Sequence, residues 1–129
     1  MNENSYYALA NKDLIAAEHM FKAELYNHSA RLCQQFLEKI LKNYIFQNGE
    51  EGDYLLLSTH NLPKIASRVE ELLNIKFEKD DLYNLRLLKD YYFDTNYPGD
   101  NFLELDYKMA KEALEFSKEF KEKYENILM

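Results

Sequence analysis

The sequence predicts an all-α fold, an up-and-down antiparallel bundle of about five helices, and three observations support this prediction. Apolar residues recur at three- and four-residue spacing in five successive segments, as they do on the buried face of a helix. Residues that commonly start or stop helices stand at the borders of these segments. No segment shows a convincing strand pattern, and 3 Gly and 2 Pro are too few for a turn-rich fold.

The first two helices are expected to form an antiparallel hairpin. Asn11 is predicted to cap the first helix, which should end near Tyr26. Asn27 is predicted to cap the second, and Gly49 to stop it after Asn48. The expected apolar stripes are Leu14, Ala17, Phe21 and Leu25 in the first helix, and Ala30, Cys33, Leu37, Ile40, Leu41 and Tyr44 in the second.

An acidic loop from Gly49 to Tyr54 and a short apolar run over 55–57 are expected next. The third helix has a well-marked start, because Asn61 can cap it and Pro63 fits its first turn. Its inward stripe is predicted to be Ile65, Ala66, Val69, Leu72 and Leu73.

Two more helices complete the predicted bundle. Asp80 is expected to begin the fourth, which carries Leu82, Leu85, Leu88 and Tyr92. Helical periodicity then breaks over 94–100, where Pro98 and Gly99 favour a turn. Asp106 is expected to cap the fifth, with Ala110, Ala113, Leu114, Ser117, Phe120, Tyr124 and Ile127 on one side.

Composition bounds the organisation and the partners of the chain. The absence of repeats and flexible linkers predicts one domain over residues 1–129. The single Cys33 is expected to be buried and unreactive. A first segment, Met1 to Tyr7, without signal-peptide features and the lack of a long apolar stretch predict a cytoplasmic protein with no membrane contact. A net charge of −7 disfavours nonspecific nucleic-acid binding.

Three blocks of sequence point to one family. Residues 34–42 have a Gln-rich start, then the pair Glu38-Lys39 and a second lysine, Lys42. His60-Asn61-Leu62 resembles a His-x-Leu helix start, and residues 85–99 resemble a helix that ends before a Tyr-Pro segment. In this order and at these distances, over nearly the whole chain, the blocks resemble the HEPN family, the higher eukaryote and prokaryote nucleotide-binding domains.

The resemblance implies a helical bundle that is often homodimeric and frequently partnered by a small nucleotidyltransferase. It does not fix one activity. Some branches of the family are ribonucleases that carry an Arg followed, after four to six residues, by a His. Here Arg86 is followed at those distances by Tyr91, Tyr92 and Phe93. A phenol replaces imidazole poorly in acid–base chemistry near neutral pH, so no catalytic residue is assigned.

Asn96 stands where the family usually has an Arg before Tyr97-Pro98, which removes one expected anion-binding group. The residues expected to bind a ligand are Lys39, Lys42, His60, Arg86, Tyr91, Asn96 and Tyr97. Each also has a structural interpretation. The Glu38, Lys39 and Lys42 group could be a solvated helix face, His60 could fix a helix start, and Tyr97-Pro98 could dock a loop.

No metal site and no cofactor are predicted, because His19 and His28 are nine residues apart and no metal-binding motif accompanies them. The run Tyr91-Tyr92-Phe93 is more aromatic than one buried stripe requires. A homodimer seam is its simplest use.

The sequence therefore predicts a HEPN-like accessory or binding module without a complete catalytic motif. Its expected partner is a nucleotide-containing ligand, a nucleotidyltransferase, or both. Two alternatives stay open: a diverged toxin-like ribonuclease of a toxin-antitoxin pair, in which Arg86 and Tyr91 keep part of the ancestral arrangement, and a purely structural dimerisation module.

Overall fold

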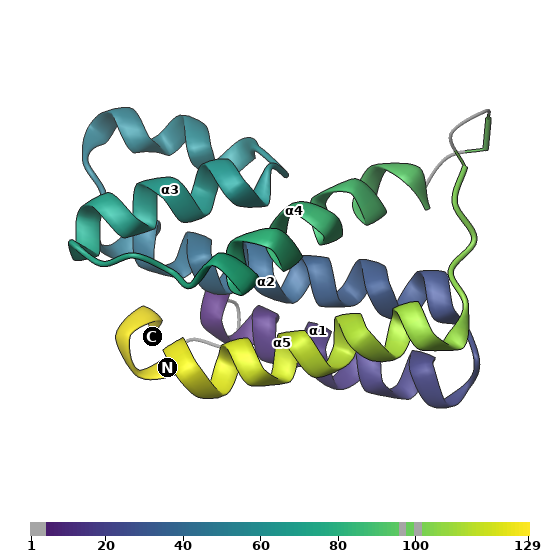
Figure 1. Ribbon diagram of the computed structural model, residues 1–129. Helices are drawn as coiled ribbons and strands as arrows, with labels where there is room; N and C mark the ends of the chain where they lie inside the picture. Colours follow the sequence, from purple (N-terminus) through teal and green to yellow (C-terminus); the bar gives the residue numbers. More distant parts are fainter. Residues whose placement is uncertain (1–4, 96–97, 100–101) are drawn as a thin grey trace.

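The computed structural model describes residues 5–95, 98–99 and 102–129. Five α-helices and one 3-10 helix, η1, make up the fold, and the described residues contain no strand (Figure 1). The predicted all-α helical bundle is confirmed. The elements are α1 (Tyr6–Lys22), α2 (Tyr26–Asn48), η1 (Glu51–Ser58), α3 (Leu62–Leu73), α4 (Lys79–Asp94) and α5 (Tyr107–Leu128).

Helix α2 is the centre of the bundle. It packs against α1, α3, α4, α5 and η1, so several of its faces are enclosed rather than the single stripe that the sequence predicts. In Figure 1, α1, α2 and α5 run alongside one another, and α3 lies at one end of the molecule. Three polar residues of α2, Gln34, Glu38 and Lys42, are buried together with its apolar side chains.

Local capping signals place several helix ends where the sequence predicts them. The Asn61 side chain accepts a hydrogen bond from the Lys64 N–H, and Asp106 accepts one from the Met109 N–H. Pro63 stands in the first turn of α3. Gly49 ends α2, and a Cβ at this position would lie 2.6 Å from the Ile45 carbonyl oxygen, so a larger residue would force the chain apart there.

Helix α1 differs from the prediction at both ends. It begins at Tyr6, because the Ser5 hydroxyl accepts a hydrogen bond from the Ala8 N–H at 3.1 Å, and the expected cap Asn11 lies inside the helix. It ends at Lys22 rather than near Tyr26. A tight turn follows, in which Glu24 adopts the left-handed conformation with φ of 62°.

Asn27 was also predicted to be a helix cap, and this is wrong. Leu25 occupies the capping position of α2 and makes no side-chain hydrogen bond there. The Asn27 amide instead donates to the Leu103 carbonyl at 3.0 Å and accepts from the Leu105 N–H at 2.8 Å. A partner 76 residues away in sequence therefore takes the side chain that local spacing assigned to the helix start.

The segment after α2 is a 3-10 helix rather than the predicted acidic loop. Its start is fixed by a capping box, in which Asp53 accepts a hydrogen bond from the Glu50 N–H at 2.8 Å. Arg68 of α3 pairs with the same Asp53 carboxylate at 2.8 Å. The acidic residues that suggested a loop thus hold a helical turn in place.

One buried carboxylate, that of Asp81, connects α4 to α5. Asp81 accepts hydrogen bonds from the Lys123 ammonium at 3.0 and 3.1 Å and from the Tyr124 hydroxyl at 2.5 Å. Helix α4 starts at Lys79, one residue before the predicted Asp80. At the end of α5, Leu128 is fully buried while Ile127, which was expected to face the core, is 42% exposed.

The start of α1 and the end of α5 lie beside each other (Figure 1). The Tyr7 hydroxyl donates to the Glu125 carboxylate at 2.5 Å, and Asn43 of α2 donates to the Leu128 carbonyl at 2.9 Å. Cys33 is fully buried, as expected, and burial raises the pKa of its thiol to about 12. None of the described helices has the length and apolar character needed to cross a bilayer.

Candidate functional site

A row of buried polar residues along α2 is the feature from which the candidate site is built. Gln34, Glu38 and Lys42 follow one another at four-residue spacing, which stacks them along one side of an α-helix. Their exposed fractions are 0%, 4% and 4%. The interpretation of Glu38 and Lys42 as a solvated face is therefore wrong, because neighbouring helices enclose this side of α2 as well. We call these three residues the polar row.

The Glu38 carboxylate joins the row together. One oxygen accepts a hydrogen bond from the Lys42 ammonium at 2.9 Å. The other lies 3.0 Å from the Gln34 amide nitrogen and 2.8 Å from Nδ1 of His60. A buried carboxylate is costly unless it is paired and hydrogen-bonded, and here both oxygens have partners.

His60 connects the buried row to the surface. Its position just before the start of α3 brings Nδ1 to Glu38, while 43% of its side chain remains exposed. This contact occupies Nδ1 and leaves Nε2 for another partner. The imidazole also stacks on the Tyr92 ring of α4, with centroids 4.6 Å apart and planes 26° apart.

The predicted ligand-binding residues do not all lie with this row. Lys42 and His60 meet at Glu38, but Lys39 forms a salt bridge with Asp13 of α1. Successive residues of an α-helix point about 100° apart, which turns Lys39 away from the side that Glu38 faces. Whether Lys39 contributes to ligand binding stays a prediction.

The remaining predicted residues belong to α4 and the segment after it. Arg86 is exposed, and the described residues include no ion pair to it. Six residues separate it from Tyr92, so the two side chains leave the helix about 120° apart. Tyr91 is only 5% exposed, and burial is the main cause that raises its pKa. Asn96 and Tyr97 lie outside the described residues.

Three residues of this cluster, Gln34, Glu38 and Tyr92, were absent from the predicted ligand-binding set. The sequence carried one usable signal for Gln34 and Glu38, the recurrence of polar residues every four positions up to Lys42. Tyr92 carried none, because its contact with His60 depends on how α3 and α4 pack on α2. The described part of the chain holds no group of three His, Cys, Asp or Glu side chains that could bind a metal ion.

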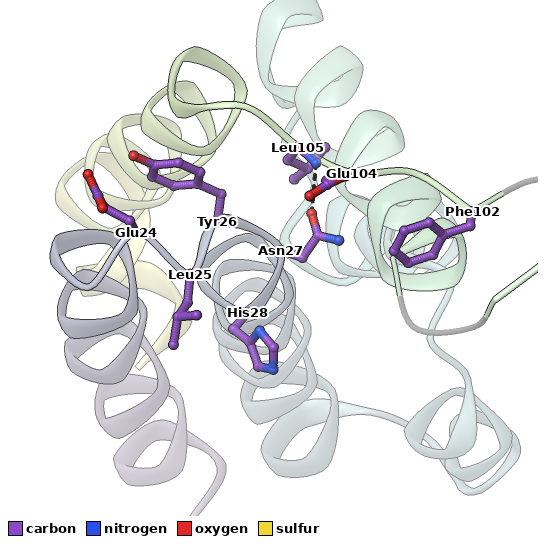
Figure 2. A pocket seen from close by; sticks show the side chains of 8 residues that line it. All are labelled: Glu24, Leu25, Tyr26, Asn27, His28, Phe102, Glu104 and Leu105. Carbon is purple, nitrogen blue, oxygen red and sulfur yellow. Dashed lines mark hydrogen bonds between the residues drawn. The ribbon is translucent and has the colours of Figure 1, made fainter.

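A separate pocket of about 270 Å³ lies between the α1–α2 turn and the segment before α5 (Figure 2). Figure 2 shows Asn27 hydrogen-bonded to Leu105 on one wall, with Tyr26 and Glu24 to one side and Phe102 to the other. The predicted ligand-binding residues that the structure describes, Lys39, Lys42, His60, Arg86 and Tyr91, do not line this pocket. Two of them, Lys42 and His60, meet at Glu38, so the candidate site is built there.

The central helix α2, its polar row and the helices packed around it define the class of this protein, an all-α bundle with a charged cluster inside it. A comparison with protein families matches residues 5–127 to the HEPN domain. The chain belongs to this family, as the three sequence blocks predicted. Searches of curated proteins and of solved structures found no match.

Proposed function

We propose that this HEPN domain is a non-catalytic accessory or binding module that takes a nucleotide-containing ligand at the exposed edge of His60 and Tyr92. The observation that carries the proposal is the Glu38 carboxylate, which lies 2.8 Å from His60 Nδ1. A buried acid that orients a half-exposed imidazole fixes which ring nitrogen is offered outward. Such a fixed donor or acceptor beside an aromatic ring suits a nucleobase.

The charges around the row assign different parts to the basic residues. The Lys42 ammonium is buried and already paired with Glu38, so it serves to hold that carboxylate rather than to meet a phosphate. Arg86 is exposed on α4 and its guanidinium suits a two-point contact with phosphate, but its side chain would have to reach around the helix, because it leaves α4 about 120° from Tyr92. Lys39 would have to leave Asp13 before it could contribute.

A partner protein belongs to the same proposal. The resemblance implies a small nucleotidyltransferase, a homodimer, or both, and the cytoplasmic location stays a prediction. Within the aromatic run on α4, Phe93 is 48% exposed while Tyr91 is buried. A dimer seam would therefore use Phe93 and the outer edge of Tyr92. Sedimentation of the wild type and of Phe93→Ser at micromolar concentration tests this, and a wild-type monomer would contradict it.

The ribonuclease alternative gains nothing from Tyr91. The side chain is buried and burial raises its pKa, so it is poorly placed to meet a substrate and to exchange a proton near neutral pH. A toxin-like role would need other residues. Cleavage of RNA by metal-free protein, lost in Arg86→Ala, would restore that alternative and overturn the non-catalytic proposal.

Calorimetric titration with ATP, and with a mononucleotide that lacks the triphosphate, tests the ligand site. His60→Ala and Tyr92→Leu are expected to weaken binding at least tenfold, and Arg86→Ala to weaken ATP more than the mononucleotide. Lys118→Ala is the matched control, because Lys118 is an exposed lysine of α5 that pairs with Glu18 of α1, and it should change binding less than twofold. Saturable heat that survives His60→Ala would overturn the proposed site, and no heat with either ligand would overturn the proposed ligand class.

A further inference from the structure

Apolar side chains gather on the outer side of η1 and the neighbouring end of α2. Leu55 is 81% exposed, Tyr54 63% and Phe46 59%. Phe46 and Tyr54 line the same shallow depression, and Tyr6 packs against the Phe46 ring with centroids 5.8 Å apart. We call Phe46, Tyr54 and Leu55 the η1 patch. Exposed apolar side chains that gather in one region commonly mark an interaction site.

Polar contacts hold η1, the helix that carries Tyr54 and Leu55 of the patch, in place. No residue of η1 is buried, and 3-10 helices longer than four residues are uncommon. Arg68 of α3 donates hydrogen bonds to both carboxylate oxygens of Asp53, at 2.8 and 3.1 Å, and this contact lowers the Asp53 pKa. Asp53 also closes the capping box with Glu50. A fixed support reduces the ordering cost of binding at the patch.

Negative charge borders the η1 patch. The Glu50 side chain is 83% exposed, and its nearest Arg68 nitrogen is 4.0 Å away. Arg68 is already shared with Asp53 and Glu71, so it neutralises Glu50 only weakly. Glu51, at the first position of η1, is exposed as well. A partner that covers the apolar side chains therefore meets carboxylates at the edge.

We propose that the η1 patch is a docking surface for a partner protein segment in which Lys or Arg residues flank an apolar side chain. This goes beyond the proposed ligand site, which lies at His60 and Tyr92. The apolar side chain would cover Tyr54 and Leu55, and the basic residues would meet Glu50 and Glu51. Complementary charge at the rim of an apolar contact favours the correct partner and speeds association.

The same charges argue against two other occupants. In a two-fold contact between two copies, the patch of one copy would face the patch of the other, and Glu50 and Glu51 would approach their own equivalents. Each chain carries a net charge of −7, so long-range repulsion adds to this cost. An anionic lipid surface would be repelled for the same reason.

A matched pair of synthetic peptides tests the proposal. Both are amphipathic and carry Leu at the same positions, one with Lys at every charged position and the other with Glu. Fluorescence polarisation should show the Lys peptide binding the wild type at least tenfold more tightly than it binds Tyr54→Ser/Leu55→Ser. Ile15→Ser is the matched control, because Ile15 is 61% exposed on α1. It should change the affinity less than twofold.

A separate variant tests the role of the carboxylates at the edge of the patch. Glu51→Lys should weaken the Lys peptide about three- to tenfold while leaving the fold intact by circular dichroism. Equal binding of the Lys peptide to the wild type and to Tyr54→Ser/Leu55→Ser would overturn the proposal, since attraction to the acidic chain as a whole would then explain it. So would equal binding of the Glu peptide, or a wild-type dimer that Tyr54→Ser/Leu55→Ser dissociates.

Discussion

Two buried carboxylates of this protein, Glu38 and Asp81, are paired in different ways. Among the described residues, Glu38 contacts Lys42 and Gln34 of its own helix and His60 from the segment before α3. Asp81 takes both Lys123 and Tyr124 from α5, more than forty residues away. The first arrangement adds little to the connection between helices, whereas the second fastens the start of α4 to α5.

This difference separates a candidate binding site from a structural contact. We call the contact of Asp81 with Lys123 and Tyr124 the clamp. Every group that Asp81 contacts serves to join two helices, and its ammonium partner reaches solvent, with the Lys123 side chain 39% exposed. The Glu38 cluster keeps its ammonium inside, with the Lys42 side chain 5% exposed, and its outlet to the surface is the imidazole. A buried cluster that reaches the surface through an imidazole ring is suited to binding, because imidazole can both donate and accept hydrogen bonds.

The largest effect is expected when the buried ammonium is removed. Lys42→Met should lower the free energy of unfolding by about 3–5 kcal/mol, because Glu38 is then left buried without its cationic partner. Replacing both residues, as Glu38→Leu/Lys42→Met, should recover most of this loss. Urea unfolding measures both, and Lys111→Met, from an exposed pair at 3.9 Å, is the control that should cost less than about 1 kcal/mol. Equal losses at Lys42 and Lys111 would contradict the buried pairing.

Breaking the clamp is expected to cost less. Asp81→Ala should lower the free energy of unfolding by about 1–3 kcal/mol, since Lys123 can turn to water while the Tyr124 hydroxyl loses its acceptor. Asp81→Asn keeps an acceptor and should lose less. In the same urea experiment, a loss at Asp81→Ala larger than that at Lys42→Met would reverse the comparison.

The clamp also predicts a change of stability in alkali. Burial and the hydrogen bond to Asp81 raise the pKa of Tyr124 from 10.0 to about 12. A raised folded-state pKa means that the contribution is complete below pH 10 and is lost as the pH rises from 10 through 12. Compared with Tyr124→Phe, the wild type should lose its advantage of about 1 kcal/mol across that window. A constant difference between the two proteins from pH 9 to 12 would show that the hydroxyl does not act through Asp81.

The smallest effect on stability is expected at His60, where the Glu38 cluster reaches the surface. His60→Ala should cost about 1 kcal/mol or less, because the side chain is 43% exposed and Glu38 retains Lys42 and Gln34. The same variant should cause the largest loss of nucleotide affinity. A stability loss as large as that of Lys42→Met, with ligand binding unchanged, would make His60 part of the structural cluster rather than of the site.

Two helix caps whose partners are close in sequence were predicted, although the equally local cap at Ser5 and capping box at Glu50 were not. Asn61 and Asp106 cap helices through the N–H group three residues ahead, so short windows of sequence contain the whole interaction. Asn27 and Asp81 act on partners far along the chain, which no local pattern specifies. The division of the chain into one domain over residues 1–129 stays a prediction.

The candidate site shows the same division. The blocks around Glu38 and His60 were visible in the sequence, and the family assignment that they supported is confirmed. The burial of Glu38 and Lys42 was not visible, because it depends on α2 being enclosed by other helices. The same side chains on an exposed helix would form the solvated row that their spacing resembles.

The adjacency of the first and last helices has a practical consequence. Tyr7 and Glu125 are in contact, while the segment between α4 and α5 lies at the far end of the bundle (Figure 1). A circular permutant that links α5 to α1 with a short glycine-rich bridge and opens near residue 99 would keep the six described helices whole. In such a rearranged chain α5 would precede α1, and the polar row, the clamp and the η1 patch would all stay in place.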